Sequence, residues 1–227
     1  MSSTREALSA CLWFTCLEAD LQTLVLAQTQ RRHFAAGEFV ARRDEPSDYW
    51  IGVHDGLLKL AVDSHAGRGC TFAGIPSGGW FGEGSVLKHE LRRYDVVALR
   101  PSLVLFVPAQ VFHELLARSL GFSVFVIGQL NERLGEFIAN IQNTRLLDVN
   151  ARVARSLAQL FNPLLYPQTR KALQLSQEEL ALLAGLSRQR VNRALGSLQE
   201  LGLIGLAYNC IDVRDLPALA RYGAEQL

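Results

Sequence analysis

The sequence predicts an α+β protein with three successive parts: an N-terminal β-roll (a double-stranded β-helix), one long helix and a C-terminal winged helix-turn-helix. Three observations carry this prediction. Ten of the 18 glycines lie between residues 37 and 84, where they separate short apolar runs, a spacing typical of small barrels and double-sheet rolls. Apolar residues then recur at steps of three and four. From residue 176 onward, two short helical patterns are joined by a glycine.

The composition is that of a folded chain. Of 227 residues, 49% are hydrophobic and 20% are charged, and 23 Lys and Arg face 22 Asp and Glu for a formal net charge of +1. This balance excludes a disordered chain and a uniform attraction to polyanions, so any nucleic-acid site must be a local patch. No basic segment followed by an apolar stretch opens the chain, and no apolar run reaches the ~18 residues of a membrane span. We therefore expect a cytoplasmic protein without membrane contact.

Strand signals fill the first part. Residues 49–53 and 57–62 are apolar runs on either side of Asp55-Gly56, a turn pair that predicts an antiparallel hairpin. Residues 66–69 predict the next turn, and 70–75 the strand after it. Two further strands are expected at 96–99 and 103–107, on either side of a turn at residues 100–102.

The long helix carries an apolar stripe. No proline interrupts residues 109–162, and a helix of about 20 residues spans about 30 Å, which outreaches a small roll. The stripe therefore predicts a two-helix dimer seam; the alternative is a helix packed on its own roll. Its members are Phe122, Val126, Leu130, Leu134, Phe137 and Ile141.

A hinge is expected near residues 143–148, because Asp148 can cap a new helix start. The predicted divisions are therefore 1–118 for the roll, 119–147 for the dimerisation helix and hinge, and 148–227 for the helix-turn-helix part. A loop with two prolines follows at residues 161–167.

The helix-turn-helix lies between residues 175 and 204. Ser176 with Glu179 forms a capping box, Gly185 can end the first helix, and Ser187 can cap the second. The inner face of the second helix would hold Val191, Ala194, Leu195 and Leu198. A short hairpin, or wing, is predicted from 203–206 and 210–213, and a last helix from Asp215.

The outward face of the second helix points to duplex DNA. Arg can bind guanine O6 and N7 together, Gln or Asn can bind adenine N6 and N7, and a helix N-terminus favours phosphate. The alternative is a structural helix pair with basic decoration. The candidate DNA-binding residues are Ser176, Ser187, Arg188, Gln189, Arg190, Asn192 and Arg193.

With these motifs the chain resembles the catabolite activator and fumarate-nitrate regulator (CRP/FNR) family. The specific pieces are the helix-turn-helix, Leu147-Asp148-Val149 at the hinge and Gly79-Trp80-Phe81-Gly82-Glu83 in the roll. The resemblance implies a homodimeric, sequence-specific transcription regulator rather than an enzyme, with an effector domain like cyclic-nucleotide-binding domains. It also implies recognition helices in the major groove at half-sites about one turn apart, and a loop at 161–169 placed where some members contact RNA polymerase.

The base-reading set departs from the cyclic-nucleotide members of that family. They carry Arg-Glu-x-x-x-Arg in the recognition helix, and the matching residues here are Arg188, Gln189 and Arg193. Glu accepts from cytosine N4, whereas Gln suits adenine. The resemblance therefore implies a half-site that differs at this base pair.

The family's cyclic-nucleotide cassette is only partly present. Gly82-Glu83 and Arg93 match, and by resemblance they would face a ribose hydroxyl and the cyclic phosphate. Tyr94 replaces Ser or Thr and fills space that the phosphate needs, and Asp95 replaces Ala with a repelling carboxylate. Phe137 and Ile138 stand where the family has polar adenine contacts. We therefore expect no response to cAMP or cGMP, and we expect Glu83 and Arg93 to pair with each other; another effector, or none, remains open.

Other chemistry finds little support in the sequence. The four cysteines, Cys11, Cys16, Cys70 and Cys210, lack the spacing of an iron–sulfur motif, although a dithiol switch between Cys11 and Cys16 stays open. His54 and His65 flank a predicted hairpin without forming a metal-binding pair. The alternative function is a ligand-binding roll that acts through protein partners, with a vestigial helix-turn-helix.

Overall fold

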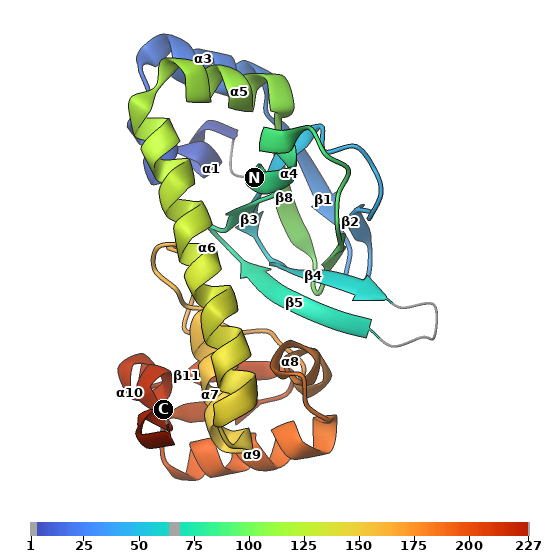
Figure 1. Cartoon of the computed structure of the whole chain (residues 1–227), viewed down its shortest axis with the longest axis vertical. Helices are drawn as coiled ribbons and strands as arrows, with labels where there is room; N and C mark the ends of the chain where they lie inside the picture. Colours follow the sequence, from blue (N-terminus) through green and yellow to red (C-terminus); the bar gives the residue numbers. More distant parts are fainter. Residues whose placement is uncertain (1–3, 64–68, 227) are drawn as a thin grey trace.

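The computed structural model describes residues 4–63 and 69–226. A β-roll with helices at its N-terminal side is joined to a smaller C-terminal part by one long helix that runs along both (Figure 1). The predicted fold class is confirmed, with the double-sheet roll, the long helix and the winged helix-turn-helix in the expected order.

The roll consists of two four-stranded antiparallel sheets. One has the order β1-β8-β3-β6, and the other β2-β7-β4-β5. The bounds of the first are Gln30–Phe34, Ser102–Pro108, Tyr49–Asp55 and Trp80–Phe81 in that order. Those of the second are Phe39–Ala41, Asp95–Ala98, Leu57–Asp63 and Gly69–Pro76. Helices α1 (Thr4–Ser9), α2 (Leu12–Thr15) and α3 (Ala19–Gln28) precede the strands, and α4 (Glu83–Lys88) interrupts them.

The hairpin predicted at Asp55-Gly56 is wrong. Strands β3 and β4 belong to different sheets, so the chain crosses between the sheets at Gly56, whose φ is +130°. A Cβ there would lie 2.1 Å from Oγ of Ser102, which explains the glycine. The hairpin that does form joins β4 to β5, from Leu57 opposite Pro76 to Asp63 opposite Gly69; the predicted turn before Gly69 lies outside the described residues.

A cluster of aromatic rings fixes the N-terminal helices to the roll. Trp13 of α2 packs edge-on to Trp50 and to Trp80, each with ring centroids 5.0 Å apart. The rings of Trp50 and Trp80 lie 4.2 Å apart. A Cβ at Gly52 would lie 2.6 Å from the Trp80 ring, so only glycine lets β6 approach β3 this closely.

The long helix α6 (Leu120–Leu146) follows α5 (Ala109–Arg118). The predicted stripe divides between two environments. Phe122 and Val126 are buried in the roll's core, at 1% and 3% exposure, whereas Leu134 and Ile141 are each 57% exposed. The stripe is therefore not one seam: its first two members follow the alternative prediction of packing on the chain's own roll.

The C-terminal part begins where the sequence predicted a hinge. Leu147 is extended (φ −90°, ψ 147°), and Asp148 caps α7 (Val149–Gln159) by accepting from the backbone N of Ala151 at 2.9 Å. Helices α8 (Gln177–Ala184), α9 (Arg188–Glu200) and α10 (Leu216–Arg221) follow, with strand β9 (Ala172–Leu173) ahead of them. The wing pairs β10 (Ile204–Ala207) with β11 (Cys210–Val213), so Ala207 lies in a strand and not in the turn.

Among the described residues, no single helix is long and apolar enough to cross a membrane; α5 and α6 meet that test only as a pair, which is bent by 114°.

Candidate functional site

Local hydrogen bonds define the helix-turn-helix. Oγ of Ser176 accepts from the backbone N of Glu179 at 3.1 Å, and Oγ of Ser187 accepts from that of Arg190 at 3.4 Å. Gly185 ends α8 with a φ of +61°. These side-chain caps stabilise the first turns of both helices, and the glycine accommodates the left-handed turn between them.

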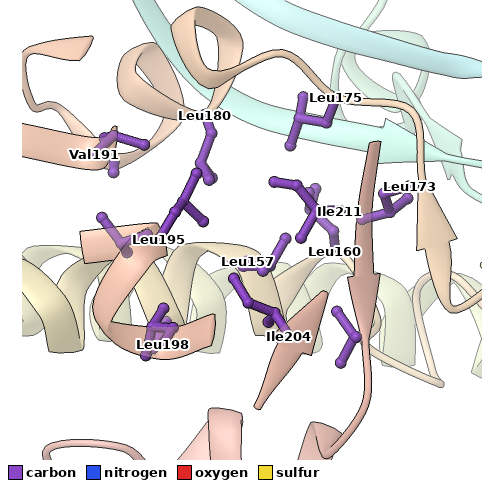
Figure 2. Packing of buried hydrophobic residues seen from close by; sticks show 14 of the residues in the cluster. Leu157, Leu160, Leu173, Leu175, Leu180, Val191, Leu195, Leu198, Ile204 and Ile211 are labelled. Atoms are coloured by element: carbon purple, nitrogen blue, oxygen red, sulfur yellow. The ribbon is translucent and has the colours of Figure 1, made fainter. Parts of the chain in front are cut away.

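The inner face of α9 holds the helix in place. Val191, Ala194, Leu195 and Leu198 are all fully buried. They pack against α7, α8 and the wing through Leu157, Leu180 and Ile204, as Figure 2 shows. Because one face of α9 is buried in this core, its rotation about its own axis is fixed, and the opposite face must point outward.

That opposite face presents the predicted DNA-binding residues together. Ser187, Arg188, Gln189, Arg190, Asn192 and Arg193 are all exposed, and Ser176 is half-buried at the start of α8. Within the described parts of the chain, none of the three arginines forms an ion pair with a carboxylate. The face is therefore a local basic patch on a nearly neutral chain, as a polyanion site requires.

Two residues beside this face escaped the sequence analysis. Gln177 of α8 accepts through Oε1 from Nδ2 of Asn192 at 2.8 Å, which orients Asn192. Tyr208, at the wing tip, is 94% exposed. A groove of about 350 Å³ runs between α8, α9 and the wing, and Gln177, Arg188 and Tyr208 line it. The position of Gln177 directly after the Ser176 cap was the available sequence signal.

A second hollow, of about 350 Å³, lies between the roll, α6 and the C-terminal part. All four predicted effector-pocket residues line it: Gly82, Glu83, Arg93 and Tyr94. Much of the remaining wall is apolar, from Leu60, Phe72, Phe81, Leu130, Leu134 and Phe137, and the C-terminal part contributes Ser156, Gln159, Leu160, Tyr166 and Leu183. The hollow therefore has walls from both ends of the chain.

The predicted pairing of Glu83 with Arg93 is wrong. Oε1 of Glu83 accepts instead from Nε of Arg133 at 3.0 Å, and Arg133 also donates to the backbone O of Trp80. Oε2 of Glu83 is buried without a hydrogen-bond partner. Burial alone would lower the pKa of Arg133, but Glu83, Tyr166, Tyr94 and Glu136 together outweigh it, with Glu83 contributing most, and the pKa lies above its ordinary value. The two residues are 50 positions apart, and no local pattern links them.

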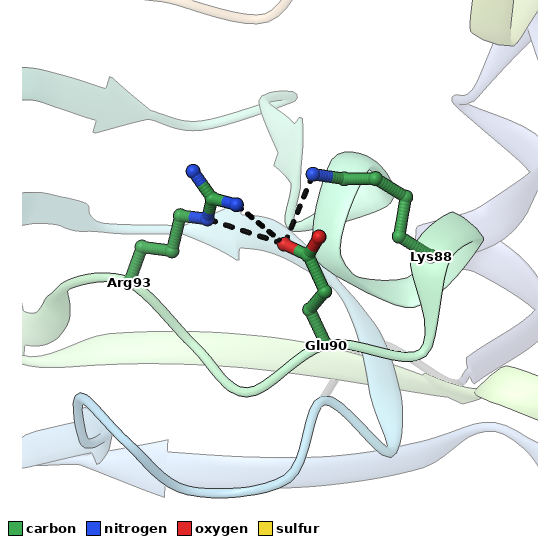
Figure 3. Close-up of polar contacts among 3 residues, drawn as sticks. All are labelled: Lys88, Glu90 and Arg93. Carbon is green, nitrogen blue, oxygen red and sulfur yellow. Dashed lines mark hydrogen bonds and ion pairs between the residues drawn. The ribbon is translucent and has the colours of Figure 1, made fainter.

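Arg93 is engaged at the rim of the hollow. Its Nη2 lies 2.8 Å from Oε2 of Glu90, and Nζ of Lys88 lies 2.9 Å from the same oxygen (Figure 3). The Arg93 side chain is 70% exposed. Two cations thus share one carboxylate, and the rim keeps a net positive charge.

Of the other residues that differ from the family's nucleotide cassette, some line the hollow and some do not. Tyr94 lines the hollow, and burial together with Glu83 raises the pKa of its phenol. Phe137 lines it too, whereas Ile138 does not and is 58% exposed. Asp95 does not line the hollow: its Oδ1 accepts from the backbone N of Arg43 at 2.9 Å, so its carboxylate is not part of the wall.

Two acids of α6 hold the loop after α7. Nδ2 of Asn162 donates to Oε1 of Glu132 at 2.9 Å and to Oε1 of Glu136 at 3.0 Å. Burial raises the pKa of Glu136 to about 7, although Asn162 and Arg133 act in the opposite direction. Gln129 also donates to the backbone O of Leu164 at 2.8 Å. The helix and the loop are therefore joined by polar contacts.

The roll also contacts the helix-turn-helix directly. Nζ of Lys59 on β4 lies 3.8 Å from Oε1 of Glu179 on α8. A Cβ at Gly74 of β5 would lie 2.7 Å from Cδ2 of Leu160, with Leu183 next to it. In the predicted capping box, the Glu179 carboxylate would accept from the backbone N of Ser176. In the structure, this carboxylate instead faces Lys59 of the roll.

Cysteine and histidine chemistry is sparse. Burial, partly offset by a hydrogen bond with Trp80, raises the pKa of Cys11 to about 11, while Cys16 is exposed. Within residues 4–63 and 69–226, no three His, Cys, Asp or Glu side chains gather where a metal could bind. His54 is half-buried in β3, and His65 lies outside the described residues.

Sequence models of known protein domains match both halves of the chain. A sequence model of the cyclic nucleotide-binding domain matches residues 31–119, and one of the Crp-like helix-turn-helix domain matches residues 151–222. The chain is 28% identical to the cyclic AMP receptor protein of Thermus thermophilus over 86% of this chain and 89% of that one. It is 26% identical to a CRP-like cAMP-activated global transcriptional regulator of Mycobacterium tuberculosis, over 92% and 94%. FixK2 of Bradyrhizobium japonicum has the same fold, with a TM-score of 0.71 at 19% identity over 84% and 95%.

Proposed function

The chain belongs to the CRP/FNR family of transcription regulators, and from this premise we propose that it acts as a homodimer that binds double-stranded DNA in a sequence-specific manner through α9. The supporting observation is the face of α9, where six candidate residues from Ser187 to Arg193 are exposed together around a fully buried inner face. Two such faces would enter successive major grooves.

The roles of the three parts follow from this proposal. Residues 1–118 form the effector domain, 119–147 the dimerisation helix and hinge, and 148–227 the DNA-binding domain. The loop at 161–169 is offered as a contact for RNA polymerase, since Pro163 and Leu164 are exposed within it. The protein acts in the cytoplasm, and it is a regulator rather than an enzyme.

We further propose that neither cAMP nor cGMP is the effector. Glu83 is engaged by Arg133, Arg93 is engaged by Glu90, and Tyr94 and Phe137 occupy the wall of the hollow. A cyclic nucleotide would have to break or share both ion pairs. The positive rim and apolar walls suit an anionic ligand with an apolar body.

Salt-dependent binding tests the DNA proposal. The full chain is titrated with duplexes obtained by selection from a random pool, at several salt concentrations. Phosphate contacts release counterions, so the logarithm of the binding constant should fall steeply and linearly with the logarithm of salt. Arg193→Ala should weaken binding, whereas the matched change Arg221→Ala on α10 should not. Flat, weak binding to every sequence would instead favour a roll that acts through protein partners.

Calorimetry tests the effector proposal. The protein is titrated with cAMP and cGMP at micromolar concentrations, and no saturable heat is expected. Clear saturable binding of either nucleotide would overturn this part of the proposal, while leaving DNA recognition untouched.

A further inference from the structure

An unpartnered seam runs the length of α6 with a heptad spacing. Its residues follow each other at alternating steps of four and three, and each of them is exposed. The apolar members are between 57% and 81% exposed. In order they are Leu120, Val124, Ile127, Asn131, Leu134, Ile138, Ile141 and Arg145.

This seam is distinct from the face that packs on the chain's own roll. The own-chain face runs through Phe122, Val126 and Gln129, which are buried, and continues to the ion-paired Arg133. In heptad notation Arg133 and Glu136 fall at c and f, away from the a and d positions of the seam. Of the seam residues only Leu134 also lines the hollow described above, and all eight are exposed in this chain.

The seam has the residue pattern of a parallel two-stranded coiled coil. Val124 and Ile138 fall at a, where β-branched residues favour two strands. At d, however, Ile127 and Ile141 alternate with Leu120 and Leu134, and Ile at d weakens the preference for two strands. The apolar residues therefore leave the number and register of strands underdetermined.

Asn131 is the exception at an a position. A single polar Asn at a lowers stability but specifies register and strand number, because an Asn side chain in such a seam is satisfied only opposite another Asn. Asn131 lies near the middle of α6, and it is exposed. A shift of one heptad would place it against Val124 or Ile138, and an antiparallel alignment, which sets a against d, would place it against a Leu or an Ile.

One flanking pair, at positions e and g, fits the same alignment by size. Gly121, Gly128 and Gly135 all fall at e, seven residues apart, and a Cβ at Gly128 or Gly135 would meet nothing within 4 Å. At g, Leu130 precedes Gly135 by five residues, whereas Ser123 precedes Gly128 and Phe137 precedes Gln142. In a parallel pair each g residue faces the e position five residues on, so Leu130 would lie over Gly135 of the partner subunit. Glycine is a poor helix former, and room for this side chain explains its presence.

We propose that Asn131 is the residue that sets the register and two-strand state of the dimer, with Gly135 receiving the side chain of Leu130 from the second copy. This inference rests on the proposed homodimer. It names the positions that make the second copy, rather than a different protein, the occupant of the seam.

Oligomeric state tests the proposal directly. The full chain and the Asn131→Val variant are compared by analytical ultracentrifugation. The control is Thr144→Val, which introduces the same residue at a g position. The wild type and the control should be dimers, while Asn131→Val should populate trimers or tetramers. When wild-type and variant subunits are mixed, mixed dimers should be rarer than random pairing gives.

A cysteine at the seam reports register. In a background with Cys16→Ser and Cys70→Ser, Ile138→Cys should form an inter-subunit disulfide in high yield, because in-register a positions lie within disulfide reach. Adding Asn131→Val should lower this yield, and the background without Ile138→Cys gives the control level. Gly135→Leu should raise the dimer dissociation constant by roughly tenfold or more, although Leu is the better helix former.

The outcomes distinguish the role of Asn131 from the existence of the homodimer. A dimeric Asn131→Val variant that keeps the wild-type disulfide yield and mixes at random overturns the role of Asn131 and leaves the homodimer intact. Tighter dimerisation of Gly135→Leu overturns the role of Gly135. A monomeric wild type overturns both this inference and the proposed homodimer.

Discussion

Arg133 and Glu83 form the most deeply buried ion pair among the described residues. Nε of Arg133 lies 3.0 Å from Oε1 of Glu83, and the two side chains are 13% and 5% exposed. The pair joins α6 to the first residue of α4, so the long helix and the effector hollow are connected by one contact. A ligand that bound Glu83 would act on α6 at the same time.

Breaking this pair should destabilise the protein strongly. Arg133→Met leaves a buried carboxylate uncompensated, which costs roughly 3–5 kcal/mol of unfolding free energy. The double variant Arg133→Met with Glu83→Gln should regain much of the loss, since the buried charge is gone. Urea denaturation measures all three proteins.

The matched control is Arg93→Met at the exposed pair with Glu90. Exposed ion pairs contribute about 0–1 kcal/mol, so this change should be nearly neutral. Equal losses for Arg93→Met and Arg133→Met would show that burial gives the inner pair no special importance.

Glu136 should make stability depend on pH. Its pKa is raised from 4.5 to about 7, so the native state keeps a proton that the unfolded chain has already released. Stability should therefore decline as the pH rises from about 4.5 to about 7, by an amount on the order of 3 kcal/mol at most. Glu136→Gln should lack this decline and be the more stable protein above about pH 7.

Denaturation of wild type and Glu136→Gln at about pH 5 and about pH 8 separates this group from the others that titrate. Glu200→Gln, at an exposed carboxylate of α9, serves as the control and should keep the wild-type slope. If Glu136→Gln kept it too, burial of Glu136 would not be the cause.

The local parts of the fold could be predicted from the sequence. The caps at Asp148, Ser176 and Ser187 and the stop at Gly185 depend on residues three or four positions apart, and each is found in the structure. The same holds for the buried face of α9. A capping residue, a glycine and a helical period are all visible within one short window of sequence.

Long-range pairing could not be predicted. Asp55-Gly56 has a turn signal, but the signal does not specify which strands will pair, and the chain crosses between sheets there. The only partner predicted for Glu83 was Arg93, ten positions away, whereas the actual partner, Arg133, is 50 positions away and has no sequence signal that links the two. On α6, the predicted stripe and the exposed seam both follow steps of three and four and share Leu134 and Ile141, so spacing alone did not separate the roll-facing side from the exposed seam.

Gln189 should contribute to the choice of operator. It is exposed in the first turn of α9, between Arg188 and Arg190. Gln189→Glu should shift preference at one base pair of each half-site by roughly 1–3 kcal/mol, since Glu accepts from cytosine N4 and Gln suits adenine. Selection from a random DNA pool with both proteins measures the shift. Identical motifs for the two proteins would remove Gln189 from the base-reading set.

The thiols should differ in reactivity. Cys11 is buried with a pKa raised to about 11, so almost none of it is thiolate near neutral pH, whereas Cys16 and Cys70 are exposed. Timed alkylation followed by mass spectrometry should label Cys16 and Cys70 quickly and Cys11 only on unfolding. Rapid labelling of Cys11 in the folded protein, or a Cys11–Cys16 disulfide under mild oxidation, would restore the dithiol switch.

Because both ends of the chain line the hollow, the size of a bound molecule should affect how the two ends are held together. A guest that just fills the space would bridge α4 to Leu160 and Leu183 and fasten the two ends of the chain together. A larger guest would wedge those leucines away from Gly74, where the clearance is already too small for a methyl group. Compounds of one chemical series should then divide into agonists and antagonists according to size, irrespective of how tightly each one binds.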